Sequence, residues 1–484
     1  MPRYAKIVAT IGPSCEDIDT LRKLILAGVD VARLNFSHGT HEEHALRIER
    51  IRQLSRELHK PVTILQDLQG PKLRVGTLPP EGIVVNLGQE VVLLPVDEDG
   101  DLPAPQGNEI QVPLHVPNLA RSVKAGNHIL LDDGQLEFEV VRVDGDAVHT
   151  RVLLGGLLKS HKGVNLPGAN LGIPGFTEKD RADLEFGLSM GIDAVAISFV
   201  RSAADVETVR AAVQSFAPQH PDTPIIAKME LPEAIENMHE IIHAADGVMV
   251  ARGDLGVEMS PQSVPIIQKK IIDSASRHAK VVITATQMLE SMVHNPRPTR
   301  AEASDVANAV LDGADAVMLS GETASGKYPV ESVMMMNAII CEAEKSFRDW
   351  GHPSGFPEEL EQQDDATSMT SAARALAHDA NVAGITVFTA SGRTALLISK
   401  SRPRVPIFAL TPEARSYYRM GLYWGVSAYL VPFTPTVESM LARVEEVMAS
   451  ATNLQAGQQV VIITGYPLGL RKAPNLALLH TIGE

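Results

Sequence analysis

Charged and hydroxyl side chains stand at the ends of several apolar runs. In "IIAKME", Lys228 and Glu230 lie two residues apart, so both face the same side of a strand. "ARGDLG" ends another run at Asp254, and "VITATQM" presents Thr286. Two carboxylates from adjacent strands suit a hard cation such as Mg²⁺, and a lysine beside them would neutralise a phosphoryl group during its transfer. The alternative is a purely structural ion pair between Lys228 and Glu230.

A second group of polar side chains lies in the segment "RLNFSHG". Arg33, Asn35 and Ser37 lie on one face of this predicted strand, and Asp67 ends the next run. Asn and Ser oxygens near Asp67 would form a small oxygen cage for a cation. Arg33 could hold a phosphate with two hydrogen bonds.

The strands and helices expected to carry these residues follow a repeating strand–helix pattern. Continuously apolar strands that alternate with helices predict a parallel sheet buried on both faces. Eight repeats suggest an α/β fold with a closed (β/α)8 TIM barrel, in which chemistry sits at the carboxyl ends of the strands. An open, doubly wound sheet is the alternative. The eight runs are "AKIVATIG", "VDVARLNFS", "VTILQDLQ", "DAVAISFV", "PIIAKME", "GVMVARGDLG", "VVITATQM" and "DAVMLSGE".

Two other segments differ from the barrel pattern. Residues 72–168 alternate polar and apolar side chains and predict β-hairpins, so we expect an all-β lid domain inserted in a barrel loop, or a tolerated insertion without function. The barrel then comprises residues 1–71 and 169–348. An acidic linker opens residues 349–484, which predict a C-terminal α/β regulatory domain.

Composition narrows the class of protein. The chain has 484 residues, a net charge of −16, and apolar residues at 44%, so it is expected to be globular and not to bind nucleic acid. Two cysteines favour a reducing compartment. With no signal-peptide pattern and no apolar run of 18 residues, the sequence predicts a cytoplasmic protein without a membrane partner.

Together these motifs resemble the pyruvate kinase family over nearly the whole chain. The matching segments are "RLNFSHG", "GPKLR", "KGVNLPG", "ARGDLGVE", "TATQMLESM", "PTRAE" and "DAVMLSGETASGKYP". The pattern is most similar to the bacterial, sugar-phosphate-regulated branch. The resemblance implies phosphoryl transfer from phosphoenolpyruvate to ADP, giving pyruvate and ATP. It also implies Mg²⁺ as cofactor, with Mn²⁺ able to substitute, and a homotetramer.

The resemblance implies a role for each matching residue. Glu230 and Asp254 would be the Mg²⁺ ligands, and Lys228 would stabilise the phosphoryl group. Arg33 would contact phosphate. The substrate carboxylate would be held by Gly253, Asp254 and Thr286, and the nucleotide by Asn35, Arg74 and Lys162. Ser202 stands where the family often has a lysine, which puts one nucleotide contact in doubt.

The same resemblance also implies a pocket for a monovalent cation. Most of the family bind K⁺ in a pocket that here corresponds to Asn35, Ser37, Asp67 and Leu68. This chain has Lys72 where those relatives have a glutamate. We therefore predict that the Lys72 ammonium substitutes for K⁺ and that K⁺ is not required. A solvated hinge lysine is the alternative.

The last domain contains a possible phosphate site in "TASGRTALL". A strand there runs into a helix, and hydroxyls and backbone N–H groups at such a turn bind phosphate readily. In the family, the matching loop holds an allosteric effector, so we expect a sugar phosphate or AMP. The alternative is ordinary capping of the helix by Ser391. The loop residues are Thr389, Ser391, Gly392, Arg393 and Thr394.

Two rival functions remain from the sequence. One is a barrel lyase of the aldol type that acts on phosphoenolpyruvate or pyruvate with the same Mg²⁺–carboxylate site. The other is a phosphate-sensing binding protein that has lost its chemistry. Lys228 argues against the binding protein and the lid argues against the lyase. ADP-dependent formation of pyruvate is expected of the kinase alone.

Overall fold

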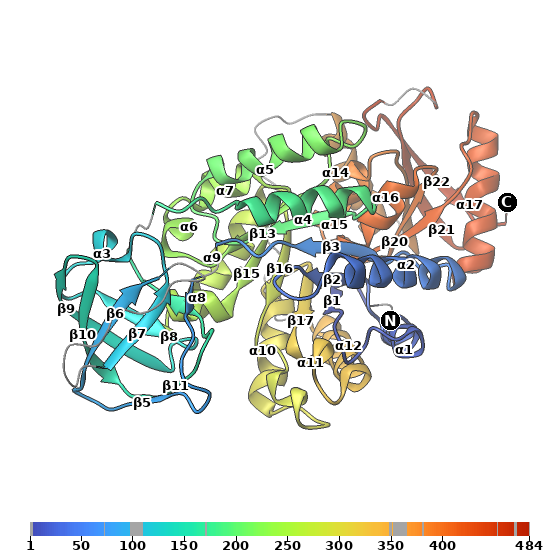
Figure 1. The fold of residues 1–484 in the computed structure, drawn as a ribbon. Coiled ribbons are helices and arrows are strands. Elements are labelled where there is room, and N and C mark those ends of the chain that lie inside the picture. Colours follow the sequence, from blue (N-terminus) through green and yellow to red (C-terminus); the bar gives the residue numbers. More distant parts are fainter. Residues whose placement is uncertain are drawn as a thin grey trace.

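The eight apolar runs form one closed barrel of parallel strands (Figure 1). Their side chains are buried on both faces, inward against one another and outward against helices, which is why the runs are continuously apolar. The open, doubly wound sheet is therefore excluded. In their order around the barrel the strands are β1 (Lys6–Thr10), β17 (Ala316–Leu319), β16 (Val281–Ala285), β15 (Gly247–Ala251), β14 (Ile225–Met229), β13 (Ala194–Ile197), β3 (Thr63–Asp67) and β2 (Val31–Asn35).

The computed structural model describes residues 3–71, 73–96, 110–169, 172–347, 351, 365–379, 382–452, 454–468 and 472–483. Helices surround the barrel, and threonine capping boxes fix the starts of α2, α4 and α10 because each threonine and a downstream acid satisfy each other's backbone N–H. The helices are α1 (Ile18–Ala27), α2 (His41–Glu57), α4 (Glu178–Ser189), α5 (Ala203–Phe216), α6 (Pro232–Glu236), α7 (Met238–Ala244), α8 (Arg252–Glu258), α9 (Val264–Arg277), the 3-10 turn η1 (Glu290–Val293), α10 (Arg300–Leu311), α11 (Gly321–Ala324) and α12 (Pro329–Lys345).

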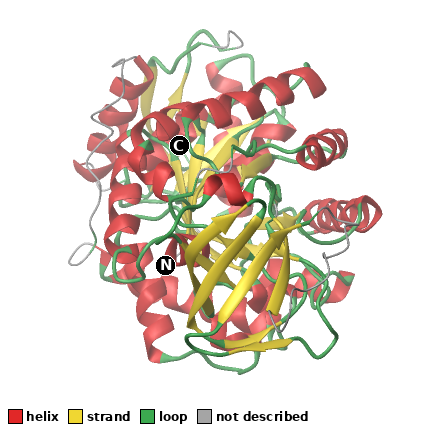
Figure 2. Cartoon of the chain, turned by 60° about the vertical axis from the view of Figure 1, so that its left-hand side comes forward, coloured by secondary structure: helices red, strands yellow, loops and turns green. Residues whose placement is uncertain are grey.

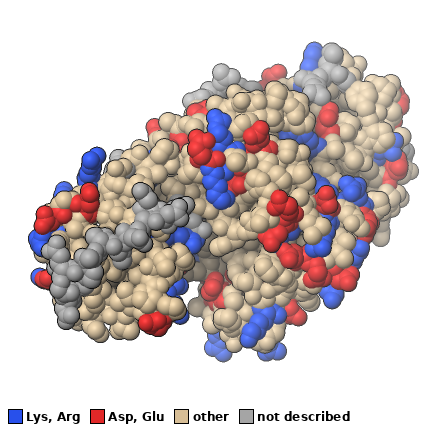
Figure 3. All heavy atoms as spheres, in the orientation of Figure 1, with Lys and Arg blue, Asp and Glu red and all other residues tan. Residues whose placement is uncertain are grey.

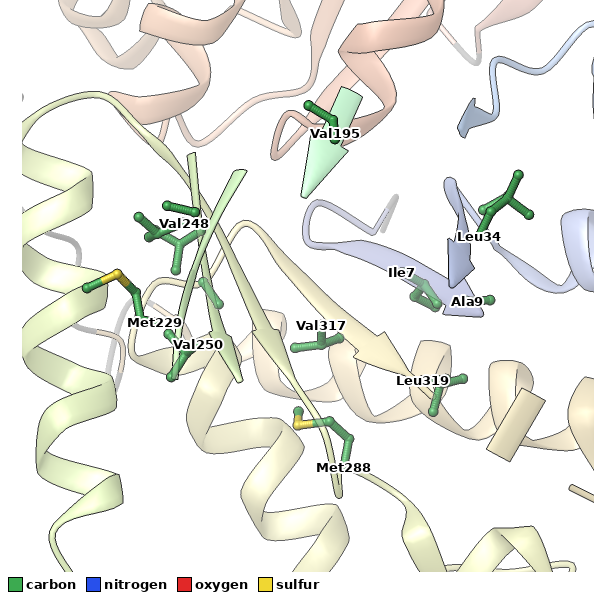
Figure 4. Packing of buried hydrophobic residues seen from close by; sticks show 14 of the residues in the cluster. Ile7, Ala9, Leu34, Val195, Met229, Val248, Val250, Met288, Val317 and Leu319 are labelled. Carbon is green, nitrogen blue, oxygen red and sulfur yellow. The ribbon is translucent and has the colours of Figure 1, made fainter. Parts of the chain in front are cut away.

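The barrel core has two layers, which follow from the alternation of side chains along each strand. Outward-facing residues such as Ile7, Leu34, Val248 and Val317 pack beneath the helices (Figure 4). Inward-facing residues fill the barrel with mostly small and β-branched side chains. The carboxyl ends of the strands are thereby held rigidly at one end of the barrel.

Between β3 and α4 the chain forms a separate β-rich domain, seen at the left of Figure 1 and as the large yellow sheet in the lower front of Figure 2. A seven-stranded sheet in the order β12-β8-β9-β10-β6-β7-β4 and a two-stranded sheet surround its own apolar core. The elements are β4 (Arg74–Val75), β5 (Ile83–Val85), β6 (Glu90–Pro95), β7 (Ile110–His115), α3 (Leu119–Ser122), β8 (His128–Leu131), β9 (Leu136–Asp144), β10 (Ala147–Leu154), β11 (Gly156–Leu158) and β12 (Val164–Asn165).

The C-terminal α/β domain carries a five-stranded sheet in the order β20-β19-β18-β21-β22, parallel except for its last pair. It closes the amino end of the barrel, since Leu422 joins the inward-facing barrel core. Its elements are α14 (Asp365–Asp379), β18 (Gly384–Phe388), α15 (Arg393–Lys400), β19 (Ile407–Thr411), α16 (Ala414–Arg419), η2 (Met420–Leu422), β20 (Val426–Leu430), α17 (Val437–Ala451), β21 (Gln459–Thr464) and β22 (Leu476–Thr481).

On the face shown in Figure 3, acidic and basic side chains are interspersed, and a notch separates the β-rich domain from the barrel. Across the described ranges, no helix has both the length and the apolar character needed to cross a membrane.

Candidate active site

Lys228 lies at the centre of a group of side chains from three neighbouring strands. Its Nζ is 2.6 Å from Glu230 Oε1 and 3.6 Å from Asp67 Oδ1. It also donates to Ser198 Oγ at 2.7 Å. Because β3, β13 and β14 are adjacent in the barrel, their carboxyl ends bring these residues together. The expected proximity of Lys228 and Glu230 is therefore observed.

Arg33, the middle residue of β2, completes this group. Its Nε donates to Asp67 Oδ2 at 2.6 Å and its Nη1 to Thr10 Oγ1 at 2.9 Å. Burial opposes ionisation of the Asp67 carboxyl, yet Lys228 and Arg33 outweigh it and lower its pKa. Asp67 is thus a fixed anion that holds the two cations in place.

The carboxylates around Lys228 carry more negative charge than the site compensates. Burial tends to lower the pKa of Lys228, but the carboxylates of Asp67, Glu230 and Asp254 reverse this and raise it. Burial raises the pKa of Glu230, and Lys228 offsets only part of that shift. Burial likewise raises the pKa of Asp254. An additional positive charge near Glu230 and Asp254 would relieve both carboxylates.

Asp254 does not end its strand, contrary to the sequence expectation. Strand β15 stops at Ala251, and Asp254 lies in the first turn of α8. The run of apolar residues ends at Ala251, and the chain turns at once into this short helix. Asp254 still faces the same cleft as Lys228 and Glu230.

The two carboxylates of Glu230 and Asp254 fit a hard divalent ion that takes its remaining ligands from water and substrate. Within the described ranges, no three His, Cys, Asp or Glu side chains cluster closely enough to hold a metal by themselves. Glu230 and Asp254 offer two carboxylates, and Mg²⁺ commonly takes one or two carboxylates and completes its shell with water and substrate phosphate. The under-compensated charge of this pair therefore suits Mg²⁺.

A cleft of about 460 Å³ opens between the barrel and the β-rich domain. The predicted residues that line it are Arg33, Asn35, Ser37, Arg74, Lys228, Glu230 and Asp254. Asp67 and Leu68 are buried beneath it. Lys162 lies in the β-rich domain and is not among the lining residues. Its Nζ pairs with Asp132 Oδ1 at 2.8 Å. Lys72 lies outside the described residues.

Gly253 precedes Asp254 and contacts Thr286, but neither Gly253 nor Thr286 is among the residues that line the cleft. The Gly253 N–H donates to Thr286 Oγ1 at 2.7 Å, and this hydroxyl donates to the Ala285 carbonyl at 2.6 Å. Thr286 follows directly after β16 with a φ of 67°. The structure therefore joins these two predicted carboxylate-binding residues to each other.

Ser198 and Asp133 are among the residues of this cleft that sequence reasoning missed. Ser198 follows β13, and its hydroxyl links Lys228 to the Leu68 carbonyl, to which it donates at 2.9 Å. A polar residue after an apolar strand was the signal that could have found it. Asp133 comes from the β-rich domain and lines the opposite wall. No periodic pattern pointed to Asp133, because its position depends on how the two domains meet.

A second predicted site, residues 389–394, lies between β18 and α15. The Gly392 N–H donates to Thr389 Oγ1 at 2.9 Å, and Gly392 adopts a φ of 84°. Gly392 is the residue that precedes α15, and the Ser391 hydroxyl accepts from the Arg393 N–H at the start of this helix at 3.4 Å, so the alternative of capping by Ser391 stays open. Ser391 and Arg393 are exposed, while Thr389 and Thr394 are buried.

The family models decide the affiliation of the chain. The model for the pyruvate kinase barrel domain matches residues 2–333, and the model for the pyruvate kinase alpha/beta domain matches residues 367–480. The chain belongs to the pyruvate kinase family.

Individual pyruvate kinases are similar over all or nearly all of this chain. One from Geobacillus stearothermophilus is 43% identical over 490 residues, which cover 100% of this chain and 81% of the relative. One from Mycobacterium tuberculosis is 41% identical over 486 residues, covering 100% and 99%. One from Agrobacterium vitis is 42% identical over 474 residues, covering 98% and 97%. The chain is therefore an enzyme with pyruvate kinase activity, which transfers a phosphoryl group between phosphoenolpyruvate and ADP and forms pyruvate and ATP.

Proposed function

We propose that the cleft described above is the active site and that the enzyme depends on Mg²⁺, held by Glu230 and Asp254, with Mn²⁺ able to substitute. The observation that carries this proposal is the position of Lys228, whose ammonium contacts Glu230 and lines the same cleft as Asp254. A charged lysine beside two under-compensated carboxylates suits phosphoryl transfer, in which catalysis is mostly positioning and charge stabilisation.

In the reaction, the bond between phosphorus and the enol oxygen of phosphoenolpyruvate breaks, and a bond to a β-phosphate oxygen of ADP forms. When bound, Mg²⁺ would neutralise charge on the phosphates. Lys228 remains charged because nearby carboxylates raise its pKa, so it can attract the transferring phosphoryl oxygens. Arg33, fixed by Asp67 and Thr10, would contact phosphate from the other side.

The enolate of pyruvate then takes up a proton at its methylene carbon. Gly253, Asp254 and Thr286 would hold the substrate carboxylate during this step. The proton path runs near Thr286 through water, since a threonine hydroxyl is too weak an acid to act alone. In the free enzyme the Thr286 hydroxyl is directed at the Ala285 carbonyl, so substrate must redirect it.

Asn35, Arg74 and Lys162 would contact the nucleotide phosphates. Asn35 and Arg74 line the cleft, which supports their assignment. Lys162 pairs with Asp132, so it would have to leave this pair when the β-rich domain, residues 72–168, acts as a lid over the barrel, residues 1–71 and 169–348.

Independence from K⁺ follows from Lys72 in the sequence. The cation pocket of Asn35, Ser37, Asp67 and Leu68 is already close to cationic side chains, because Asp67 pairs with Arg33 and approaches Lys228. An assay with tetramethylammonium as the only monovalent cation should give full activity. A large loss of rate that K⁺ restores would contradict this proposal.

We further propose a homotetramer in the cytoplasm that is regulated at residues 389–394 of the C-terminal domain, residues 349–484, by a sugar phosphate or AMP. Thr389, Ser391, Gly392, Arg393 and Thr394 would hold the phosphate. The turn at Gly392 and the exposed Ser391 and Arg393 support this assignment.

Replacement of Lys228 by methionine tests the active site. Turnover should fall by roughly 10³-fold, while Mn²⁺ affinity, measured by electron paramagnetic resonance, should stay within a few-fold. The matched control is Lys280→Met, because Lys280 is also partly buried but lies at the amino end of β16, where it donates to the carbonyls of His243 and Ala245. Near-normal turnover of Lys228→Met would refute its role.

A further inference from the structure

Arg252 links the two strand ends that form the carboxylate side of the site. It is the first residue of α8, directly before Gly253, and its side chain is 10% exposed. Its Nη2 donates to the Thr286 carbonyl at 2.8 Å and its Nε to the Ala285 carbonyl at 3.3 Å. One guanidinium therefore holds the end of β15 against the end of β16.

The turn that Arg252 holds is strained. Thr286 and Gln287 have φ values of 67° and 54°, so two successive residues occupy the left-handed region. This region is unfavourable for residues with a branched Cβ such as threonine, and it persists where surrounding contacts enforce it. The hydrogen bonds from Arg252 to the Ala285 and Thr286 carbonyls, which flank the Thr286 Cα, are such contacts.

The strained turn in turn positions Gly253. The Thr286 hydroxyl accepts from the Gly253 N–H at 2.7 Å, so the hydroxyl can reach this group only while the turn keeps its shape. A Cβ at position 253 would lie 3.5 Å from Thr286 Oγ1, an ordinary van der Waals contact, so the two segments are packed together. Asp254 follows immediately in the chain. The turn and the start of α8 therefore form one unit.

Asp305 anchors the guanidinium from a third element, α10. Arg252 Nη1 lies 2.7 Å from Asp305 Oδ1 and from Oδ2. Helix α10 is itself fixed, because its residue Glu302 caps its start at Thr299 and accepts from the Ser291 N–H of η1 at 2.7 Å. The planar, multi-donor guanidinium can serve Asp305 and the two carbonyls at once, which the single ammonium of a lysine cannot reproduce.

We propose that Asp305, acting through Arg252, is a positioning residue that holds Thr286 and Gly253 in the geometry required by the carboxylate of phosphoenolpyruvate. This inference rests on the proposed function, because it takes Thr286 and Gly253 as the carboxylate site. Neither Asp305 nor Arg252 needs to touch the substrate. Loss of the ion pair between Arg252 and Asp305 should therefore weaken the binding of phosphoenolpyruvate and leave the binding of the nucleotide unchanged.

The test compares Asp305→Asn and Arg252→Lys with a matched pair at the other end of the same strand. In both variants the KM for phosphoenolpyruvate should rise at least tenfold, while the KM for ADP stays within twofold. The control is Arg210→Lys, since Arg210 binds Asp246 at 3.2 Å and the Ala244 carbonyl at 2.6 Å just before β15 begins. It should change neither KM. Equal shifts of both KM values in Asp305→Asn and Arg252→Lys, or the same shift in the control, would overturn the inference.

A double-mutant cycle with Thr286→Ala separates this inference from the proposed function. If Asp305 acts through the Thr286 turn, Asp305→Asn should add less than twofold to the KM for phosphoenolpyruvate in the Thr286→Ala background. If the two effects multiply in full, the positioning role is wrong and the carboxylate site stands. If Thr286→Ala itself leaves the KM unchanged, the carboxylate site is wrong, and the inference falls with it.

Discussion

The two ends of the barrel both carry ion pairs, but in different surroundings. At the amino end, an aspartate stands just before each of four strands and accepts the backbone N–H of the neighbouring strand. Each of these aspartates also pairs with at least one basic side chain. The bonds are Ile7 N–H to Asp30 at 2.9 Å, Ile64 N–H to Asp193 at 2.7 Å, Ile225 N–H to Asp246 at 2.9 Å and Val282 N–H to Asp315 at 2.7 Å. Their basic partners are Arg3, Arg52, Arg210 and, for Asp315, Lys400 with Arg402.

At the carboxyl end, Lys228 and Arg33 serve the three carboxylates of Asp67, Glu230 and Asp254. Lys228 is shared by Asp67 and Glu230, and burial raises the pKa of both Glu230 and Asp254. These residues also face an open cleft instead of a packed domain. Charged groups that face a cleft can be reached by a ligand, whereas those at the amino end are covered by the C-terminal domain or by packed side chains.

The strongest test of this contrast is Glu230→Gln at the carboxyl end. Activity should fall by roughly 10³-fold, because one of two proposed metal ligands is lost. The thermal unfolding midpoint should change little, since an amide in place of a carboxylate with a raised pKa removes charge that burial disfavours. Turnover and differential scanning calorimetry measure the two effects. Substantial activity with a normal Mn²⁺ affinity would contradict the assignment.

The opposite result is expected for Asp315→Asn at the amino end. This change leaves Lys400 and Arg402 buried without their shared anion, which should lower the free energy of unfolding by about 3 kcal/mol. Urea denaturation measures that loss. Turnover assayed well below the unfolding midpoint should stay within about threefold. A variant that is stable but inactive would show that the two ends are not separate in role.

The sequence predicted the barrel well because each strand repeats the same local signal. Eight apolar runs with polar residues at their ends indicated both the fold and Lys228, Glu230 and Arg33. The sequence pattern placed Asp254 at the end of a strand, but the structure places it in a short helix. The error arose because the residue pattern does not distinguish a three-residue extension of a strand from the start of a short helix.

Other features depend on tertiary contacts that no local pattern reveals. The pairing of Lys162 with Asp132 and the approach of Asp133 to the cleft follow from how the β-rich domain folds and meets the barrel. The aspartates before β2, β13, β15 and β17 were readable as the repeated "VDV", "IDA", "ADG" and "ADA". Their basic partners come from distant parts of the chain, so these ion pairs could not be foreseen.

A pH dependence sharpens the contrast further. Burial, aided by Arg402, outweighs Asp315 and lowers the pKa of Lys400 from 10.5 to about 8. Between these two values the unfolded chain binds more protons at this site than the folded chain, so its contribution to stability rises with pH. From pH 8 to pH 10 the wild type should gain up to about 2 kcal/mol relative to Lys400→Met. Urea denaturation of both proteins across this range measures the difference. A constant difference would show that Lys400 keeps its usual pKa.

The smallest effect on catalysis is expected at the proposed effector loop, which stands apart from both barrel ends. Gly392 has a φ of 84°, and a Cβ there would lie 3.5 Å from Met420 Cγ and from Tyr423 Cε2. Gly392→Ala should therefore cost about 1 kcal/mol of stability and disturb the backbone N–H groups that would bind phosphate. Basal turnover should stay within twofold, while the shift in half-saturation by phosphoenolpyruvate caused by sugar phosphates or AMP should be lost.

The matched control for this loop is Gly457→Ala, because Gly457 has a φ of 86° but a methyl group added there would meet no atom within 4 Å. It should lose a similar amount of stability through backbone strain and keep the effector response. If both variants respond to effectors as the wild type does, phosphate binding at residues 389–394 is wrong. If both lose the response, general destabilisation of the C-terminal domain explains the effect. Loss in Gly392→Ala alone would tie regulation to this turn.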